Sequence, residues 1–207
     1  MNRKKGDLIT DESFSIIRRR LGDFRASPEE MEIIIRIAHT TGDVDFAATF
    51  QMSREGLLRG AEALARGRNV VTDVEIVRAG IRRSLVEEMG GRVECLLNLP
   101  EVEAEALRLG DTRSAVAMRR AAPLLEGGVA AIGNAPTALF RLLELIDEGV
   151  PAPVSVLGGP VGFVGSAQSK DELIADPRGM EYLVVRGRRG GSAIAAAAVN
   201  AIASERE

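Results

Sequence analysis

Apolar positions change their spacing about a third of the way along this 207-residue chain. In the first third they lie three and four positions apart, which is typical of amphipathic helices. This spacing predicts helices over residues 11–21, 28–41 and 53–67, separated in part by an irregular stretch at residues 43–52. From residue 69 on, short apolar runs alternate with helical segments instead.

The short apolar runs contain almost no polar residues, which is typical of strands that are buried on both faces. Five strands are predicted, at residues 69–72, 92–97, 128–132, 153–157 and 182–186. Further helices are predicted at residues 73–79, 101–108, 113–125, 136–147 and 191–204. Alternation of strands and helices favours a parallel sheet with right-handed crossovers. We therefore expect an α/β fold with a doubly wound sheet of about five mostly parallel strands and an added N-terminal helical layer.

Local signals mark the ends of several predicted helices. Ser27 is a favourable N-cap, and Gly42 can adopt the left-handed conformation that ends a helix. Ser53 and Asp73 are expected to cap the helices that follow them. Pro123 is expected to break the helix predicted around it, because proline lacks the backbone donor and clashes with the preceding turn.

His39 lies in the last turn of the predicted helix 28–41 and is the only histidine of the chain. Imidazole titrates near neutral pH without help from its surroundings, so proton transfer falls most naturally to this residue. Arg36 lies on the same helix face, one turn earlier. A structural role is the alternative, because a cationic histidine interacts favourably with the negative end of a helix dipole. The helix alone leaves both interpretations open.

Composition and charge exclude several classes of protein. A formal net charge of −3, with one Tyr, six Phe and no Trp, is unlike a nucleic-acid-binding protein. Cys95 is the only cysteine, so an internal disulfide is excluded and the usual zinc ligands are missing. The basic N-terminus leads into no apolar signal segment, and no apolar run is long enough to cross a membrane. We expect a cytoplasmic protein, a single domain over residues 1–207, without a metal site, a membrane partner or a nucleic-acid partner.

Glycine-rich and basic segments follow several predicted strands. Ligands of doubly wound sheets bind beyond the carboxyl ends of the strands, and helix starts at this edge favour anions. Lys170, Arg188 and Arg189 lie in or near these segments. Turn glycines and a solvated basic rim are the structural alternative, but several such segments at one edge favour a large ligand with several acidic groups.

Motifs for nucleotide binding and for covalent catalysis are missing. Residues 165–170 are superficially similar to a phosphate-binding P-loop, but the order of glycine, lysine and hydroxyl residues is wrong. The first strand is not followed by G-x-G-x-x-G, and the chain has no G-x-S-x-G. The chemistry that remains is proton transfer with a polyanionic ligand, without a cofactor.

Several sequence blocks carry a resemblance to a known family. These are residues 13–18, 36–39, 72–77, 111–115, 133–139, 162–164, 169–170 and 187–192. With these blocks in this order, the chain resembles the precorrin-8X methylmutase (cobalt-precorrin-8 methylmutase) family over almost its whole length. The resemblance implies a flavodoxin-like α/β fold, a homodimer and an isomerase of cobalamin biosynthesis. Its reaction moves a methyl group from C-11 to C-12 of a corrinoid tetrapyrrole, converting precorrin-8X to hydrogenobyrinate, or the cobalt form to cobyrinate.

The resemblance also implies roles for individual residues. His39 matches the acid–base histidine of the family, which donates a proton to the macrocycle and recovers it after the methyl group has moved. Ser13 and Arg36 match substrate contacts, and a guanidinium can hold a ring carboxylate through two hydrogen bonds. The resemblance implies no cofactor, and it leaves open whether the substrate itself carries cobalt.

Four more substrate contacts are expected from position in the chain. Thr72 and Arg113 are candidates for contacts with the ring or its carboxylates, although Arg113 is equally consistent with an ordinary surface charge. Lys170 and Arg188 would belong to the anion-binding wall formed by the segments after the strands.

Three positions depart from the family pattern. Thr10 replaces a frequent aromatic residue, Gln168 a frequent glutamate and Ile76 a frequent methionine. None of them affects the acid–base histidine, so no loss of catalysis is implied. The alternative function is a non-catalytic corrinoid-binding carrier that retains the product. A phospho-acceptor regulatory domain is disfavoured, because only Asp73 supplies a carboxylate at the end of the first predicted strand.

Overall fold

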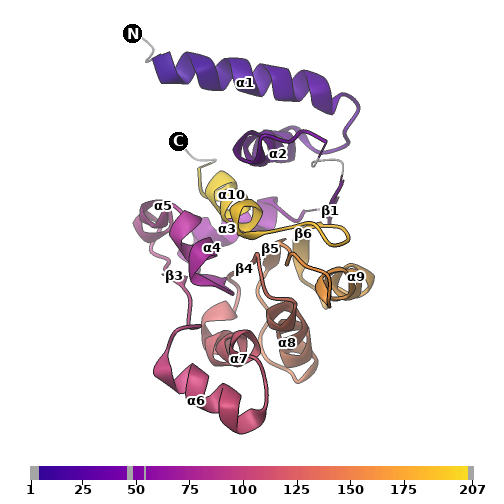
Figure 1. Cartoon of the computed structure of the whole chain (residues 1–207). Helices are drawn as coiled ribbons and strands as arrows, with labels where there is room; N and C mark the ends of the chain where they lie inside the picture. Colours follow the sequence, from indigo (N-terminus) through magenta and orange to yellow (C-terminus); the bar gives the residue numbers. More distant parts are fainter. Residues whose placement is uncertain (1–4, 46–48, 54, 205–207) are drawn as a thin grey trace.

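A six-stranded sheet forms the centre of the computed structural model, which describes residues 5–45, 49–53 and 55–204 (Figure 1). The strands are β1 (Phe50–Met52), β2 (Val70–Thr72), β3 (Val93–Glu94), β4 (Val129–Ile132), β5 (Ser155–Gly158) and β6 (Glu181–Val185). Their order in the sheet is β1-β6-β5-β4-β2-β3. Every neighbouring pair is parallel except β1 and β6. The predicted α/β fold with a mostly parallel, doubly wound sheet is confirmed.

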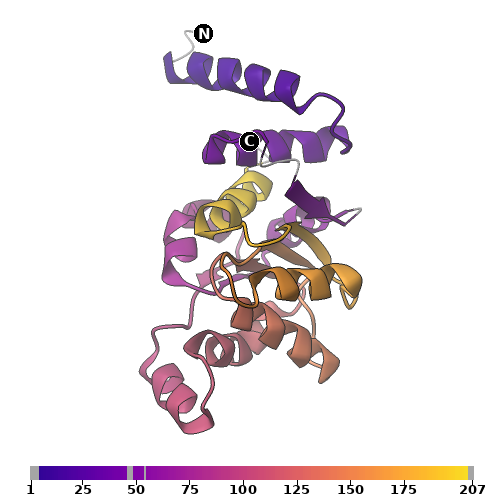
Figure 2. The same ribbon diagram turned by 45° about the vertical axis from the view of Figure 1, so that its right-hand side comes forward.

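Helices cover both faces of this sheet. They are α1 (Lys5–Leu21), α2 (Pro28–Thr41), α3 (Leu58–Ala65), α4 (Glu75–Gly80), α5 (Arg83–Glu88), α6 (Pro100–Leu109), α7 (Arg113–Leu125), α8 (Pro136–Asp147), α9 (Ser166–Ala175) and α10 (Ser192–Ala203). Helices α7, α8 and α9 pack on one face, and α3 and α10 pack on the other (Figures 1 and 2). Within the described ranges, no helix is both long and apolar enough to cross a membrane.

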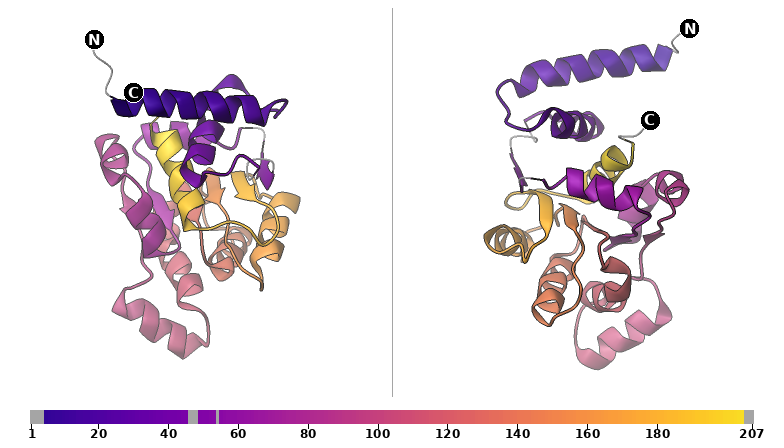
Figure 3. Two further views of the ribbon diagram at one scale, coloured as in Figure 1. Left: turned by 45° about the horizontal axis from the view of Figure 1, so that its top comes forward. Right: turned by 180° about the vertical axis from the view of Figure 1, so that it is seen from behind.

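The N-terminal helices form a layer of their own outside α10. Helix α2 packs on α10, and α1 packs on the outer side of α2, as Figure 3 shows from above and from behind. The buried residues of α2 divide between these contacts: Ile33, Ile34 and Ile37 belong to the core shared with α10, whereas Ile35 and Ala38 face α1. The predicted added helical layer is confirmed.

Alternate strand residues enter the two cores on either side of the sheet. In β4, Val129 and Ala131 face the core beneath α10, whereas Ala130 and Ile132 face the core formed with α7 and α8. Because successive strand side chains point to opposite faces, both sets must be apolar when helices cover both faces. This is the physical reason for the uninterrupted apolar runs.

Gly158 allows α10 to lie close to the end of β5. It has a φ of 106°, and a Cβ at this position would lie 2.6 Å from the Cβ of Ala195. Glycine is therefore required at this position, both because of its positive φ and because a Cβ would clash with Ala195. The close contact positions the opposite side of α10 against α2, where the candidate site is formed.

Some predicted element boundaries near the N-terminal third are wrong. Residues 50–52 are not irregular but form β1, an edge strand too short to show a pattern in the sequence. Ser53 does not cap a helix: its hydroxyl accepts a hydrogen bond from the backbone N–H of Tyr182 at 2.7 Å, and α3 starts only at Leu58. Residues 46–48 of the predicted irregular stretch lie outside the described residues.

The helix predictions need correction at other places too. Helix α1 starts at Lys5, before the predicted residue 11, and the pattern did not predict α5 or α9. Pro123 lies inside α7 and does not break it. It falls in the last turn, where the helix ends soon after, so its effect on the hydrogen-bond ladder is small.

Candidate active site

Helix α2 places His39 through two well-defined ends. Ser27 accepts a hydrogen bond from the N–H of Glu30 at 3.2 Å, and the Glu30 carboxylate accepts one from the N–H of Ser27 at 3.0 Å, which completes a capping box. At the other end Gly42 adopts a φ of 66°. Since the buried face of α2 packs against α10 and α1, Arg36 and His39 remain exposed on the rim between them.

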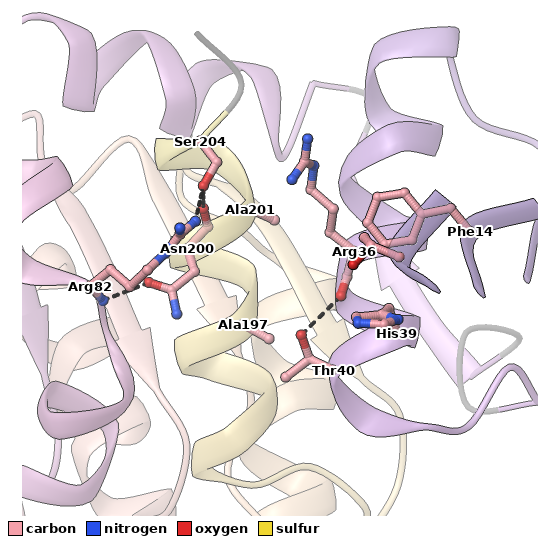
Figure 4. A pocket seen from close by; sticks show the side chains of 10 residues that line it. Phe14, Arg36, His39, Thr40, Arg82, Ala197, Asn200, Ala201 and Ser204 are labelled. Carbon is pink, nitrogen blue, oxygen red and sulfur yellow. Dashed lines mark hydrogen bonds between the residues drawn. The ribbon is translucent and has the colours of Figure 1, made fainter. Parts of the chain in front are cut away.

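His39 lies between two hollows. The first has a volume of about 270 Å³ and opens between α1, α2 and α10 (Figure 4). It is lined by Thr10, Phe14, Arg36, His39, Thr40, Arg82, Ala197, Asn200, Ala201 and Ser204. The second has a volume of about 340 Å³, lies on the α1 side and is lined more by apolar residues. His39 is the residue that lines both.

Two residues of α1 hold the imidazole ring. Oγ of Ser13 lies 2.8 Å from Nδ1 of His39. The ring of Phe14 meets the imidazole edge-on, with 5.3 Å between the ring centroids and 80° between the planes. The guanidinium of Arg36 lies 5.7 Å from the centroid of the Phe14 ring. Because Ser13 occupies Nδ1, the nitrogen that remains for a ligand is Nε2.

The opposite wall of the first hollow carries a second arginine, Arg82, which sequence reasoning missed. Asn200 of α10 accepts a hydrogen bond from the N–H of Arg82 at 2.7 Å and donates one to the carbonyl of Gly80 at 2.9 Å. The guanidinium of Arg82 also donates to Oγ of Ser204. The signal in the sequence that could have indicated this wall is Asn200, a polar residue within a largely apolar helix.

Arg36 and Arg82 give the hollow a positive character. Figure 4 shows their side chains on the two sides of α10. Among the described residues, neither guanidinium forms an ion pair with a carboxylate. Guanidinium groups bind carboxylates through paired, charge-assisted hydrogen bonds. The hollow is therefore suited to a ligand with acidic side groups.

The usual ligand position of a doubly wound sheet is filled by Asp73. The strand order reverses between β2 and β4, and the loops beyond these strands form the crevice in which such folds bind ligands. There, the carboxylate of Asp73 accepts hydrogen bonds from the N–H groups of Gly133, Asn134 and Ala135 at 3.0, 2.8 and 2.7 Å. The expectation that Asp73 caps its own helix was wrong, because its carboxylate binds the loop that precedes α8 instead.

Thr72 and Lys170 do not line either hollow beside His39. Thr72 is buried, and its hydroxyl donates toward the carbonyls of Val74 and Glu94. Lys170 is fully buried, and its Nζ donates to the carbonyls of Pro160 and Arg189 at 2.8 and 2.6 Å. Both side chains bond to backbone carbonyls of the fold, whereas the sequence had suggested a substrate contact for Thr72 and an anion-binding wall for Lys170.

The stability of the protein is expected to depend on pH through Lys170. Burial lowers the pKa of this amine from its ordinary 10.5 to about 8. Between these values the unfolded chain binds more protons than the folded one, so the free energy of unfolding rises with pH across this window. Below pH 8 the folded state keeps a buried cation; above that, a neutral amine still has two N–H groups for its two carbonyls.

Lys170→Met should remove the rise of the free energy of unfolding with pH, which is on the order of 1–3 kcal/mol in the wild type. The measurement is urea unfolding of both proteins at intervals from pH 7 to pH 10.5. Parallel curves for wild type and variant would contradict the prediction.

Arg113 and Arg188 lie elsewhere on the surface. Arg113 starts α7 and lines a separate hollow beside α6. The guanidinium of Arg188 lies 5.2 Å from the ring centroid of Phe163, which is 82% exposed. Of the predicted site residues, the structure brings together His39, Ser13 and Arg36, which come from α1 and α2.

Fold and site together define a doubly wound α/β protein with its one histidine beside a hollow that two arginines line. Residues 8–205 match the family described as precorrin-8X methylmutase. The chain belongs to this family, whose members are methylmutases, a class of isomerases.

Full-length relatives support this assignment. The chain is 47% identical over 205 residues to the precorrin-8X methylmutase of Pseudomonas aeruginosa, covering 99% of this chain and 98% of the relative. It is 37% identical over 194 residues to the cobalt-precorrin-8 methylmutase of Priestia megaterium, covering 94% and 85%. Its structure is similar to that of the precorrin-8X methyl mutase from Thermus thermophilus, with a TM-score of 0.84, 33% identity and coverage of 94% and 95%. The resemblance seen in the sequence is confirmed.

Proposed function

We propose that this protein moves a methyl group from C-11 to C-12 of precorrin-8X, or of cobalt-precorrin-8, in cobalamin biosynthesis. His39 is the proton donor and acceptor. The observation that carries this proposal is the position of the only histidine, which lines two hollows and has its Nδ1 in contact with Ser13, so that Nε2 is the nitrogen left for a ligand.

The proposed reaction uses the imidazolium form of His39. Its Nε2 proton passes to the conjugated macrocycle, which weakens the bond between C-11 and the methyl group. The methyl group migrates to C-12, and the macrocycle returns the proton to Nε2, so that no proton is consumed. An intramolecular shift of this kind needs no protein nucleophile, which agrees with the missing nucleophile motifs.

Substrate binding is assigned to the charged walls of the first hollow. Arg36 and Arg82 each hold a carboxylate side chain of the macrocycle. Thr72 and Lys170 are better explained as structural residues, because their polar atoms are already bonded within the fold. Arg113 and Arg188 lie away from His39, and their roles as substrate contacts remain predictions.

We also propose that a homodimer is the active form and that residues 1–207 act as one domain. The hollow of about 270 Å³ is below the range of ~300–1,000 Å³ typical of pockets that enclose small ligands, and a corrinoid with its acidic side chains is larger still. A second copy can cover the part of the macrocycle that the hollow leaves outside. Light scattering tests this, and a monomer in solution would contradict it.

The test of function has two stages. The purified protein is first titrated with hydrogenobyrinic acid and followed by absorbance, and it is then incubated separately with precorrin-8X and cobalt-precorrin-8. A spectral shift followed by conversion of either substrate supports the proposal. Binding without conversion of either would favour the corrinoid carrier, and absence of both would contradict a corrinoid function.

Replacing Arg82 should weaken ligand binding. We expect Arg82→Ala to raise the Kd for hydrogenobyrinic acid by about tenfold, which is the size of one charge-assisted hydrogen bond. The difference should shrink as salt is added, because salt screens exposed charges. Arg83→Ala is the matched control, since Arg83 is an exposed neighbour that does not line the hollow. Equal Kd values for the two variants would contradict the assignment.

A further inference from the structure

A third hollow lies at the edge of the sheet where the parallel strands begin. Its volume is about 460 Å³, compared with about 270 and 340 Å³ for the two hollows beside His39. One wall is formed by α3 and the residues on either side of it, and the other by Gly127 and Val154, which come just before β4 and β5. The third hollow shares no lining residue with the other two, so it is a separate place on the molecule.

Five charged side chains line this third hollow, and they do not cancel. They are Glu55, Arg59, Glu62, Arg66 and Arg68. The guanidinium of Arg66 is paired with the carboxylate of Glu62, with 3.3 Å between them. Within the described ranges, the side chains of Arg59 and Arg68 form neither an ion pair nor a hydrogen bond. Two free cations therefore stand against the carboxylate of Glu55, which leaves the hollow with an excess of positive charge.

The two free guanidinium groups border the hollow from different walls. Gly127 has a φ of 64°, and a Cβ at this position would lie 3.5 Å from both Cζ and Nε of Arg68. The guanidinium of Arg68 thus lies against the backbone of Gly127, on the wall opposite α3. Arg59 belongs to α3 itself. About two helical turns separate the two residues, a span that two arginine side chains can bridge to one ligand.

Helix α3 does not explain both arginines by its own electrostatics. Cations are favourable at the C-terminal end of a helix and unfavourable at its N-terminal end. Arg68 follows the C-terminal end of α3, but Arg59 is the second residue of this helix. Arg59 therefore carries an unpaired positive charge at the positive end of α3, where it gains nothing from the helix.

We propose that this hollow binds a phosphate group between Arg59 and Arg68, either as the free ion or as a monoester of a small polar molecule. A phosphate monoester carries a charge of about −1.5 to −2 at pH 7 and three strong acceptor oxygens. It can therefore accept from two guanidinium groups at once and balance both charges. A carboxylate carries a single charge, and one guanidinium satisfies it. The volume lies within the range of ~300–1,000 Å³ typical of sites for small molecules.

Phosphate binding can be measured without any corrinoid. Inorganic phosphate and glycerol 3-phosphate are titrated separately into ¹⁵N-labelled protein at low ionic strength and followed by ¹H–¹⁵N NMR. We expect the Nε–Hε signals of Arg59 and Arg68 and the amide signal of Gly127 to shift and saturate, with a Kd on the order of 1 mM, because the charges are exposed. The compound with the lower Kd identifies the form of phosphate that the site takes. Sodium chloride at the same ionic strength should give no saturable shift.

Substitutions of exposed arginines assign the site. Arg59→Ala and Arg68→Ala should each raise the Kd by roughly 3–10-fold, the effect of losing a charge-assisted hydrogen bond. Arg68→Lys keeps the charge without the planar fork and should raise the Kd by less than Arg68→Ala. Arg92→Ala is the matched control, because Arg92 is exposed just before β3 at the same edge of the sheet and does not line the hollow. It should change the Kd by less than about twofold.

Two results would overturn the inference. One is the absence of saturation by either compound at about 10 mM, tenfold above the expected Kd. The other is an equal Kd in Arg68→Ala and Arg92→Ala, which would mean that the arginines contribute only to the general charge of this surface. The inference does not rest on the proposed methyl shift, so a protein without turnover would leave both measurements decisive.

Discussion

Replacing His39 by glutamine is expected to lower kcat for the methyl shift by roughly 10²–10⁴-fold, the range typical of a lost general acid–base group. Glutamine keeps a polar side chain of similar reach but cannot donate and recover a proton near neutral pH. The exposed ring contributes little to the core, so the fold should be retained. The Kd for hydrogenobyrinic acid should change by less than about threefold, because Arg36 and Arg82 remain.

The measurement combines turnover of precorrin-8X with an absorbance titration of the product. Thr40→Ala is the matched control: Thr40 lines the same hollow, but its hydroxyl donates to the carbonyl of Arg36 within the helix at 3.0 Å. We expect this variant to keep near-normal turnover. Full activity of His39→Gln would contradict the proposed acid–base role. A carrier, by contrast, would show binding in both variants and turnover in neither.

Asp73→Ala is expected to lower the free energy of unfolding by about 3–5 kcal/mol, because it leaves three backbone N–H donors without their acceptor, two of them buried and one partly buried. Asp73 is only 2% exposed. Burial raises the pKa of its carboxyl, and the backbone N–H groups of Gly133, Asn134 and Ala135 act in the opposite direction. Urea unfolding at neutral pH measures the loss.

Two further variants make the Asp73 prediction specific. In Asp73→Asn, the amide oxygen can take the place of Oδ2 and accept the hydrogen bonds from Asn134 and Ala135. This variant then loses only the hydrogen bond from Gly133. We expect its free energy of unfolding to fall by about half as much as that of the alanine variant. Glu75→Gln breaks an exposed ion pair with Arg78 and should cost less than about 1 kcal/mol. If Asp73→Ala unfolds at the same urea concentration as wild type, the prediction is contradicted, and water has replaced the carboxylate.

Helix α2 was predictable because its signals are local. The Ser27 cap and the Gly42 stop act within a few residues of their own helix, and both are present in the structure. The strands of the parallel core were predictable for a related reason: helices on both faces require every position to be apolar. The edge strand β1 was missed, since three residues paired with β6 need no pattern of their own.

The candidate site was predictable only in part. Nothing in the sequence indicates that Arg82 faces Arg36 across a hollow, because the contact depends on how α10 packs against α2. The hydrogen bond from the N–H of Gly133 to the carboxylate of Asp73 likewise joins loops after two different strands. Lys170 was predicted to bind anions, and only the structure reveals that its amine is buried and donates to two backbone carbonyls.

By itself, the sequence determined the fold class, the family resemblance and the identity of the one residue suited to proton transfer near neutral pH. These follow from composition, from periodicity and from the order of short blocks, all of which can be read along the chain. Tertiary structure alone decided where that residue lies: between α1 and α10, at a distance from the sheet edge where the fold usually binds ligands. The physical reason is that the carboxylate of Asp73 occupies the backbone N–H groups at that edge of the sheet. The packing of α1 and α2 outside α10 forms a separate hollow beside His39.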